Sequence, residues 1–195
     1  MKSKILIILA LFAILTSSCH KCRKKSPFKI TKVDKQMIPY TIEQTVRFVD
    51  SEGHFLVFIV NSVNITTDEY EKCVPFETLN VSLKSERDNL TIYLSINSND
   101  GNYIEIWLRP LIYYLYYDKK GNFYTREKKF HYEQYFHENL EINNKFFYDV
   151  VECIVNEPNY YVENKDRLPL RVLYNKTYGI LQLEDKDKVI LTIDN

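Results

Sequence analysis

The stretch that decides the fold is Leu90-Thr-Ile-Tyr-Leu-Ser-Ile96, followed by Asn97-Ser-Asn-Asp-Gly-Asn102 and Tyr103-Ile-Glu-Ile-Trp-Leu108. In the first segment every second residue is apolar, as in a strand with one buried and one exposed face. Asp100-Gly101 is typical of a tight hairpin turn, because both residues tolerate positive φ. The stretch therefore predicts two antiparallel strands joined by a hairpin.

The same rhythm continues in both directions along the chain. All four glycines fall at or beside predicted turns, and β-branched and aromatic residues fill the segments between them. Short strands at regular spacing predict an all-β domain, an antiparallel meander that forms a sandwich or a partly open barrel with few short helices. The first of the other predicted strands begins at Ile38. The remaining ones cover 54–60, 79–83, 111–117, 123–130, 146–155, 171–174, 179–183 and 189–193.

Three further turns and two helix candidates complete this prediction. Asn143-Asn144 is expected to turn a hairpin, and loops are expected at 118–122 and 185–188. Residues 67–73 are compatible with one or two helical turns. Residues 128–140 stay open between helix and strand, because their aromatic residues give only a partial helical face.

The first 18 residues have the three zones of an export signal. Lys2 and Lys4 precede the apolar run Ile5–Leu15, and the small residues Thr16, Ser17 and Ser18 follow it. The apolar run is too short for a membrane-spanning helix, which needs roughly 20 residues. We therefore predict a cleaved signal over residues 1–18, and a remaining length that suits one domain.

Leu15-Thr-Ser-Ser-Cys19 resembles the lipobox of bacterial lipoproteins. The resemblance implies that the Cys19 thiol carries diacylglycerol, that the chain is cut before Cys19 and that the new amino end is acylated. Each buried CH₂ of such chains contributes about 0.8 kcal/mol to membrane binding. Residues 19–37 would then be a basic, lipid-anchored tether and residues 38–195 a single β-rich domain. The alternative is an ordinary cleaved signal whose next residue is a cysteine.

Further motifs resemble uncharacterised Bacteroidota lipoproteins. They are Ile38-Pro-Tyr40, Phe147-Tyr-Asp-Val-Val151 and Leu173-Tyr-Asn-Lys-Thr-Tyr-Gly-Ile-Leu-Gln182. The resemblance implies an antiparallel β domain on a lipid tether, without a particular activity. In that group an acidic run after the cysteine accompanies surface export. Its absence here implies an outer-membrane anchor that faces the periplasm.

Charge argues against a nucleic-acid partner. The chain carries 26 basic and 26 acidic side chains, whereas nucleic-acid-binding domains are strongly basic. Six of the basic residues and none of the acidic ones precede Ser26. The body after Ser26 is therefore mildly acidic, and the basic tether suits anionic lipid headgroups.

Cys73 and Cys153 lie in core-like surroundings and allow two interpretations. An exported protein is permitted a disulfide between them, which typically contributes about 2–4 kcal/mol. The alternative is two buried free thiols that act as small hydrophobic residues. Cys19 and Cys22 form the only CxxC pair, and Cys19 is assigned to lipid, so a redox or zinc site is disfavoured.

The chain contains 16 tyrosines and 11 phenylalanines, and Tyr113-Tyr-Leu-Tyr-Tyr117 is the densest aromatic stretch. Exposed tyrosine suits the binding of sugars, peptides or another protein, because it gives contact area at low entropic cost. The candidate aromatic binding surface therefore comprises Tyr113, Tyr114, Tyr116 and Tyr117. The alternative is that these tyrosines cover a sheet whose second face is half-buried.

The side chains that come nearest to a metal-ligand pattern are His131, Glu133 and His137. Along an extended strand the first and last would be about 20 Å apart, too far to share an ion. The sequence also contains no GxSxG, HExxH or phosphate-binding glycine loop. We therefore predict neither a metal nor a cofactor.

Two functions follow as expectations. The first is a lipid-anchored envelope protein that acts as a non-enzymatic binding or assembly module, with an envelope protein or a glycan as partner. The second is a small periplasmic hydrolase whose catalytic side chains converge only in the folded chain.

Overall fold

The described part of the protein is an antiparallel β structure with one short helix. The computed structural model describes residues 28–70, 74–87, 90–99, 102–108, 111–129, 132–155, 170–185 and 189–194. Helix α2 spans Lys32–Met37. The strands are β1 (Thr45–Asp50), β2 (Phe55–Tyr70), β3 (Val74–Ser85), β4 (Thr91–Asn97), β5 (Tyr103–Leu108), β6 (Leu111–Tyr116), β7 (Arg126–Lys129), β8 (Tyr132–Ile142), β9 (Lys145–Val155), β10 (Arg171–Asn175), β11 (Gly179–Glu184) and β12 (Val189–Ile193).

All twelve strands belong to one sheet, in the order β6-β5-β4-β3-β2-β1-β12-β11-β10-β9-β8-β7. Two meanders, β1–β6 and β7–β12, are joined by the antiparallel pairing of β1 with β12. Every neighbouring pair is antiparallel, which confirms the all-β antiparallel prediction.

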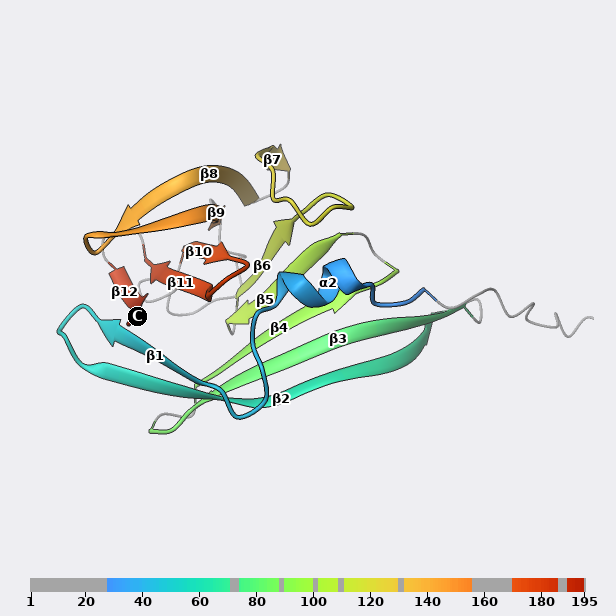
Figure 1. Ribbon diagram of the computed structural model, residues 1–195, viewed down its shortest axis with the longest axis horizontal. Helices are drawn as coiled ribbons and strands as arrows, with labels where there is room; N and C mark the ends of the chain where they lie inside the picture. The colour runs from blue at the N-terminus through green and yellow to red at the C-terminus, as the bar shows by residue number, and fades with distance from the viewer. Residues whose placement is uncertain are drawn as a thin grey trace, which may run out of the picture.

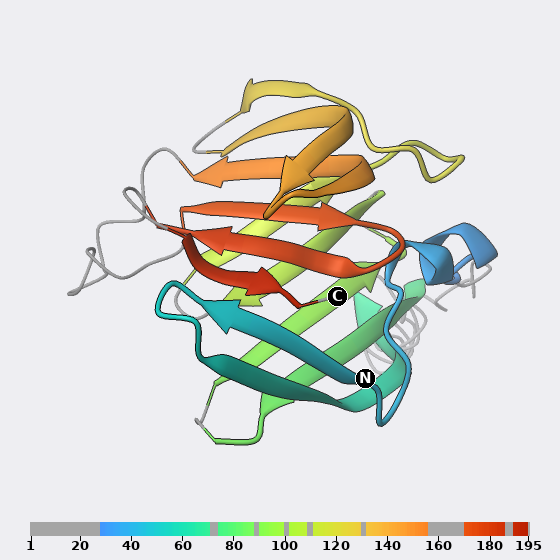
Figure 2. The ribbon, with the colours of Figure 1, turned by 60° about the vertical axis from the view of Figure 1, so that its left-hand side comes forward.

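The sheet curls until it forms a nearly closed barrel. Strand β6 returns to contact β8 and β9, although it is not their neighbour in the sheet order. Figures 1 and 2 show β8 to β12 lying over β4 to β6 in this way. Gln134 spans the seam: its Nε2 donates to the carbonyl of Tyr116 at 2.8 Å, and its Oε1 accepts from the Tyr116 N–H at 2.7 Å. One side chain thus pairs with backbone groups of the edge strand.

The interior of the barrel is filled by side chains. Alternate residues of each strand point inward, as predicted for Leu94 and Ile96 in β4, and the resulting cluster spans nearly all strands. The largest fully buried side chains are Tyr113, Tyr117, Tyr174, Phe48, Phe58 and Met37. The barrel is therefore a packed core.

Helix α2 packs against one end of the barrel. Thr31 caps it, with reciprocal bonds between Thr31 and Asp34 that satisfy two backbone N–H groups. Met37 is fully buried, and its carbonyl accepts from the Tyr174 hydroxyl at 2.6 Å. Residues 28–37 lie within the segment predicted as tether, so the folded part extends earlier than residue 38. Residues 19–27 lie outside the described chain.

Two motifs on which the family resemblance rests meet beside this helix. The hydroxyl of Tyr40, from Ile38-Pro-Tyr40, accepts the Ile180 N–H at 2.8 Å. The ring of Tyr40 covers Gly179, which has φ 79°. A Cβ on Gly179 would lie 2.1 Å from the Tyr40 hydroxyl oxygen, so no other residue fits without movement.

The strand predicted from Ile38 begins only at Thr45. Ile42 and Glu43 are the central residues of a turn, Glu43 has φ 65°, and Ile42 is exposed. The Thr41 N–H donates to the Gln44 side chain at 2.9 Å and stabilises the turn. Local side-chain bonding therefore interrupts an alternation that by itself indicates a strand.

The helix predicted as a candidate at 67–73 is wrong for its described part. Thr67–Tyr70 extend β2 and pair with Val74–Glu77 of β3. Pairing with the neighbouring strand favours this extension, because one isolated helical turn is unfavourable to nucleate. Residues 71–73 lie outside the described chain.

The described part of 128–140 is strand: residues 128–129 end β7, and residues 132–140 belong to β8, which pairs with β9. Residues 130–131 lie outside the described chain. The hairpin turn predicted at Asn143-Asn144 is confirmed, with φ 50° and 61° and a closing pair Ile142–Lys145. The predicted antiparallel pairing of β4 with β5 is also confirmed, whereas Asp100 and Gly101 of the predicted turn lie outside the described chain.

Candidate functional site

The structure divides the predicted aromatic surface between two faces of β6. Tyr113 and Tyr117 point into the core and are 0% and 2% exposed, so they do not belong to a binding surface. Tyr114 and Tyr116 point outward and are half-buried. Successive side chains of a strand point to opposite faces, which imposes this division.

Outward side chains of β2 to β6 align in two lateral rows. Because residues paired across a sheet share one face, the register brings them together. The rows are Ser62, Ser82, Tyr93, Trp107, Ile112 and Asn64, Asn80, Ser95, Glu105, Tyr114.

A groove of about 480 Å³ lies along these rows, over β2 to β5. Tyr93 and Trp107 are 45% and 40% exposed. The hydroxyls of Ser62 and Ser82 bond to each other at 2.7 Å beside them. We call this surface the outer groove.

A small hydrogen-bond network fixes the polar side of the outer groove. Glu105 Oε2 accepts from Ser95 Oγ at 3.0 Å and from Trp107 Nε1 at 3.1 Å. Asn80 Nδ2 donates to Thr66 Oγ1 at 3.2 Å. The indole of Trp107 is thereby held in position by a carboxylate, while its exposed surface remains available.

An unpredicted bulge creates part of the outer groove. The register shifts between Val60 and Ser62, so Asn61 has no cross-strand partner. Val60 points inward and is fully buried, whereas Ser62 and Asn64 turn outward into the groove. A strict alternation would have placed Ser62 inside, next to Val60.

Three tyrosines extend the aromatic surface beyond the outer groove. The ring of Tyr103 lies 5.4 Å from that of Tyr114 and 5.5 Å from that of Tyr116. Arg126 stacks on Tyr116, with its guanidinium carbon 3.8 Å from the ring centre. Burial, and then the charge of Glu105, raise the pKa of Tyr114, so its phenol stays neutral at physiological pH.

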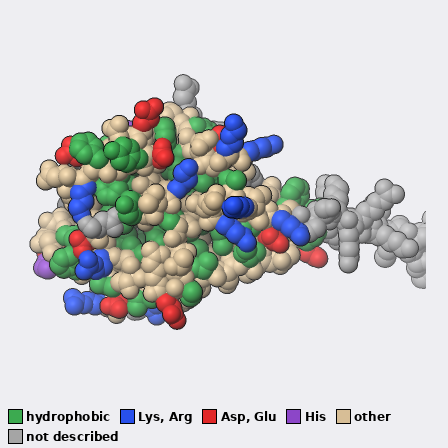
Figure 3. All heavy atoms as spheres, viewed as in Figure 1, with side chains coloured by type: hydrophobic (Ala, Val, Ile, Leu, Met, Phe, Trp, Pro, Cys, Tyr) green, Lys and Arg blue, Asp and Glu red, His purple; other side chains and the backbone are tan. Residues whose placement is uncertain are grey.

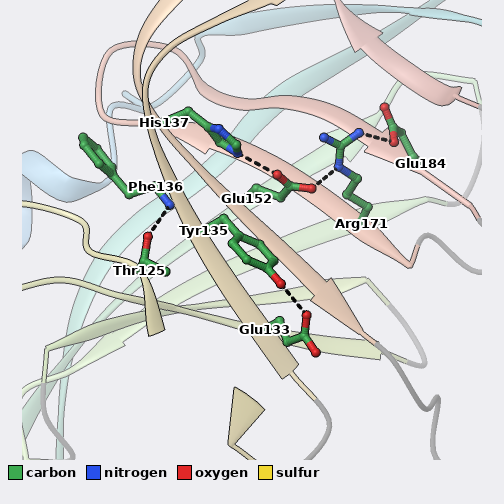
Figure 4. Close-up of polar contacts among 8 residues, drawn as sticks. All are labelled: Thr125, Glu133, Tyr135, Phe136, His137, Glu152, Arg171 and Glu184. Carbon is green, nitrogen blue, oxygen red and sulfur yellow. Dashed lines mark hydrogen bonds and ion pairs between the residues drawn. The ribbon is translucent and has the colours of Figure 1, made fainter. Parts of the chain in front are cut away.

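Another polar cluster lies on the outer surface of β8 to β11 (Figure 4). His137 Nε2 and Glu152 Oε2 are 2.6 Å apart, and Arg171 joins Glu152 to Glu184. Burial alone would lower the pKa of Arg171, but the two carboxylates outweigh it and raise that pKa. The cluster is thus a chain of polar contacts across four strands, in which Arg171 lies between the carboxylates of Glu152 and Glu184.

Among the described residues, this cluster has no nucleophile beside its imidazole and carboxylate. Both Glu152 oxygens are engaged, and no serine or cysteine joins His137 among the contacts of the described residues. Cys153, the next residue after Glu152, points to the opposite face into the core. An imidazole and a carboxylate without an adjacent nucleophile do not form a triad.

The metal candidates do not converge. Glu133 accepts from the Tyr135 hydroxyl at 2.6 Å, His137 contacts Glu152, and His131 lies outside the described residues. Within the described ranges no three His, Cys, Asp or Glu side chains are placed to hold a metal ion. His54 lies in an exposed turn with Asp50 and Glu52.

Of the two cysteines with alternative interpretations, the described residues include only Cys153. Its thiol is buried and forms no disulfide with another described residue, and it donates weakly to the Tyr114 carbonyl at 3.9 Å. Burial raises the pKa of Cys153 to about 12. Cys19 and Cys73 lie outside the described residues, so the lipidation and disulfide predictions remain predictions.

Sequence reasoning missed Tyr93, Trp107, Asn80 and Glu105 as site residues. Each occupies a polar-side position of a predicted strand, and Trp107 is the single tryptophan of the chain. The polar-side position indicates which residues face outward. It does not reveal that β2 to β5 lie side by side, because only pairing and register bring the residues together.

Over the described residues, no helix has the length and apolar character needed to cross a membrane. Comparisons with protein-family models, with curated proteins and with solved structures found no match.

Proposed function

We propose that this chain is a lipid-anchored envelope protein that acts as a non-enzymatic binding or assembly module. The observation that carries the binding part is the outer groove, where Tyr93 and Trp107 are exposed beside fixed polar groups. Rigid aromatic side chains with a few oriented polar groups are typical of binding sites. The anchor part rests on Leu15-Thr-Ser-Ser-Cys19.

The anchor would orient the domain. Phe28 forms an isolated parallel β-bridge with Phe76 near the end of the β2–β3 hairpin. The described chain begins there in Figure 1. Eight residues lie between Cys19 and Phe28, so the distance between these two residues is at most about 30 Å. With Cys19 in the outer membrane, this end of the hairpin would be nearest the bilayer and the barrel would extend into the periplasm.

The anchor is tested by the intact mass of the protein extracted from native membranes. The expected mass is that of residues 19–195 plus diacylglycerol and one acyl chain. The variant Cys19→Ala should lose these lipids and leave the membrane fraction, whereas Cys22→Ala should not. A wild-type mass without lipid would overturn the anchor and the proposed location.

A small periplasmic hydrolase is the second candidate, favoured only by the His137–Glu152 pair. It is tested with generic nitrophenyl ester and glycoside substrates on the purified protein. We expect no turnover above that of a heat-denatured sample. Turnover that disappears in the triple variant His54→Ala, His131→Ala, His137→Ala, with the fold intact, would replace the binding proposal by an enzymatic one.

A further inference from the structure

We infer that the outer groove binds a neutral oligosaccharide. The inference rests on the proposed binding function and adds to it the ligand class and the residues responsible. It follows from the aromatic rings, the polar groups and the charge of the groove, and from the position of its strands in the sheet.

The aromatic rings suit the apolar faces of sugar rings. Tyr93 and Trp107 are direct cross-strand neighbours, so their side chains leave the same face of the sheet together. The face of an aromatic ring carries partial negative charge and attracts the polarised C–H groups of a pyranose. Since the Trp107 N–H is bonded to Glu105, the indole is oriented before a ligand arrives.

The polar groups suit the hydroxyls at the edge of a sugar. Asn64, Asn80 and Ser95 line the groove in the row next to the aromatic residues. Amides and hydroxyls both donate and accept, as sugar hydroxyls do. Glu105 uses Oε2 for both of its bonds to Ser95 and Trp107, and Oε1 takes part in neither.

The charge of the groove favours a neutral ligand. Among the described residues that line the groove, Glu105 carries the one formal charge, and no lysine or arginine is present. A phosphate, sulfate or uronate would meet a carboxylate without a cation to pair with it. Nucleic acid and anionic polysaccharides are therefore disfavoured at this site.

The topology disfavours a peptide. A peptide that adds a strand needs a free sheet edge, but β3 and β4 are paired on both sides. A folded protein partner typically buries about 800 Å² on each side, whereas a groove of about 480 Å³ matches a small-ligand pocket. An oligosaccharide is the ligand that satisfies size, charge and chemistry together.

The test is a fluorescence titration, because Trp107 is the only tryptophan and lies in the site. The full mature protein is kept in a polyoxyethylene detergent, which contains no sugar. The probes are cellohexaose, maltohexaose, mannohexaose and chitohexaose, with hexagalacturonate as the anionic comparison. Each is added up to about 10 mM, a concentration that fills even a site with Kd near 1 mM.

We expect at least one neutral hexasaccharide to change the fluorescence with saturation, and hexagalacturonate to bind more weakly. Tyr93→Ala should weaken binding about tenfold, while Tyr93→Phe, which keeps the ring, should retain it. The matched control is Tyr148→Ala, which removes a 70% exposed tyrosine on the β8–β9 hairpin and should change nothing.

Three results would overturn the inference. They are no response to any neutral probe, tighter binding of hexagalacturonate, or equal weakening by Tyr148→Ala and Tyr93→Ala. Circular dichroism of each variant separates lost binding from lost folding. None of these results changes the intact mass, so the glycan inference can fail while the lipid-anchored envelope location stands.

Discussion

At the residue scale, Tyr40 and Gly179 form a contact that depends on the absence of a side chain. Tyr40 is buried, and its hydroxyl accepts the Ile180 N–H. Burial raises the pKa of Tyr40 above its ordinary value, so the phenol stays protonated. The contact joins the segment after α2 to the turn between β10 and β11, positions 140 residues apart in the sequence.

Gly179→Ala should lower the free energy of unfolding by roughly 2–5 kcal/mol, from backbone strain and a clash with the Tyr40 ring. Gly53→Ala is the matched control, because Gly53 has a similar φ of 86° but nothing within 4 Å of its Cβ position. Urea denaturation measures both. Equal losses in the two variants would show that Tyr40 does not crowd Gly179.

Cys153 illustrates how burial controls reactivity. Its pKa of about 12 means that the thiolate is scarce at pH 8, and the side chain is fully buried. We expect iodoacetamide to leave Cys153 unmodified in the native protein at pH 8 and to modify it in denaturant, as read by peptide mass spectrometry.

The same measurement separates the two cysteine interpretations. Modification in denaturant without reductant means that Cys153 is a free thiol. A requirement for reductant would mean that Cys153 forms a disulfide, as the first interpretation predicts. Cys22 serves as the internal control for reagent activity, since it lies in the predicted tether.

At the scale of elements, two aspartates close loops in the same way. Asp50 accepts the backbone N–H groups of Glu52 and His54 in the β1–β2 turn. Asp118 accepts those of Lys120 and Asn122 after β6. These N–H groups favour the carboxylate and lower the pKa of both aspartates, with the His54 and Asn122 N–H as the largest causes.

A lowered folded pKa gives a stabilisation that is present above the unfolded value of 3.8 and lost as the pH falls through the folded value. The backbone amide resonances of Lys120 and Asn122 should therefore titrate together, with a midpoint below 3.8. Asp118→Asn should abolish this titration, while Asp68→Asn on β2 should preserve it. A midpoint above 3.8 would contradict the loop geometry.

The sequence predicted most elements from local patterns, because the alternation in Leu90–Ile96 and the positive φ of Asn143-Asn144 are local properties. The sequence-based prediction was wrong where strand pairing or a local side-chain hydrogen bond determines the backbone conformation. The turn at Thr41–Gln44 and the extension of β2 through Thr67–Tyr70 are both of this kind.

At the scale of the whole molecule, the barrel depends on its seam. Gln134 is 3% exposed, and its amide also donates to the Tyr124 carbonyl at 2.7 Å. In Figure 3 acidic and basic side chains are interspersed over the visible face, without a large area of one sign. At the seam, the Gln134 amide forms neutral hydrogen bonds to backbone groups of Tyr116 and Tyr124.

Gln134→Leu should lower the free energy of unfolding by about 1–3 kcal/mol, because the Tyr116 backbone N–H and carbonyl would lose their side-chain partner. It should also speed amide hydrogen exchange at Tyr116. Gln44→Leu, at an exposed turn position, is the control and should leave that exchange unchanged. A loss of stability without faster exchange at Tyr116 would contradict a closing function for Gln134.

The sequence by itself determined the class of the fold, many of the strands and several turns, since these follow from side-chain period and backbone preference. It also carried the export and lipidation expectations in residues 1–19. The tertiary structure alone decided that β1 pairs with β12, that Tyr40 covers Gly179, and that Tyr93 and Trp107 share a groove with Asn64 and Asn80. These contacts depend on register, on the bulge at Asn61 and on closure of the sheet. Such features arise from pairing between distant segments, which no local pattern encodes.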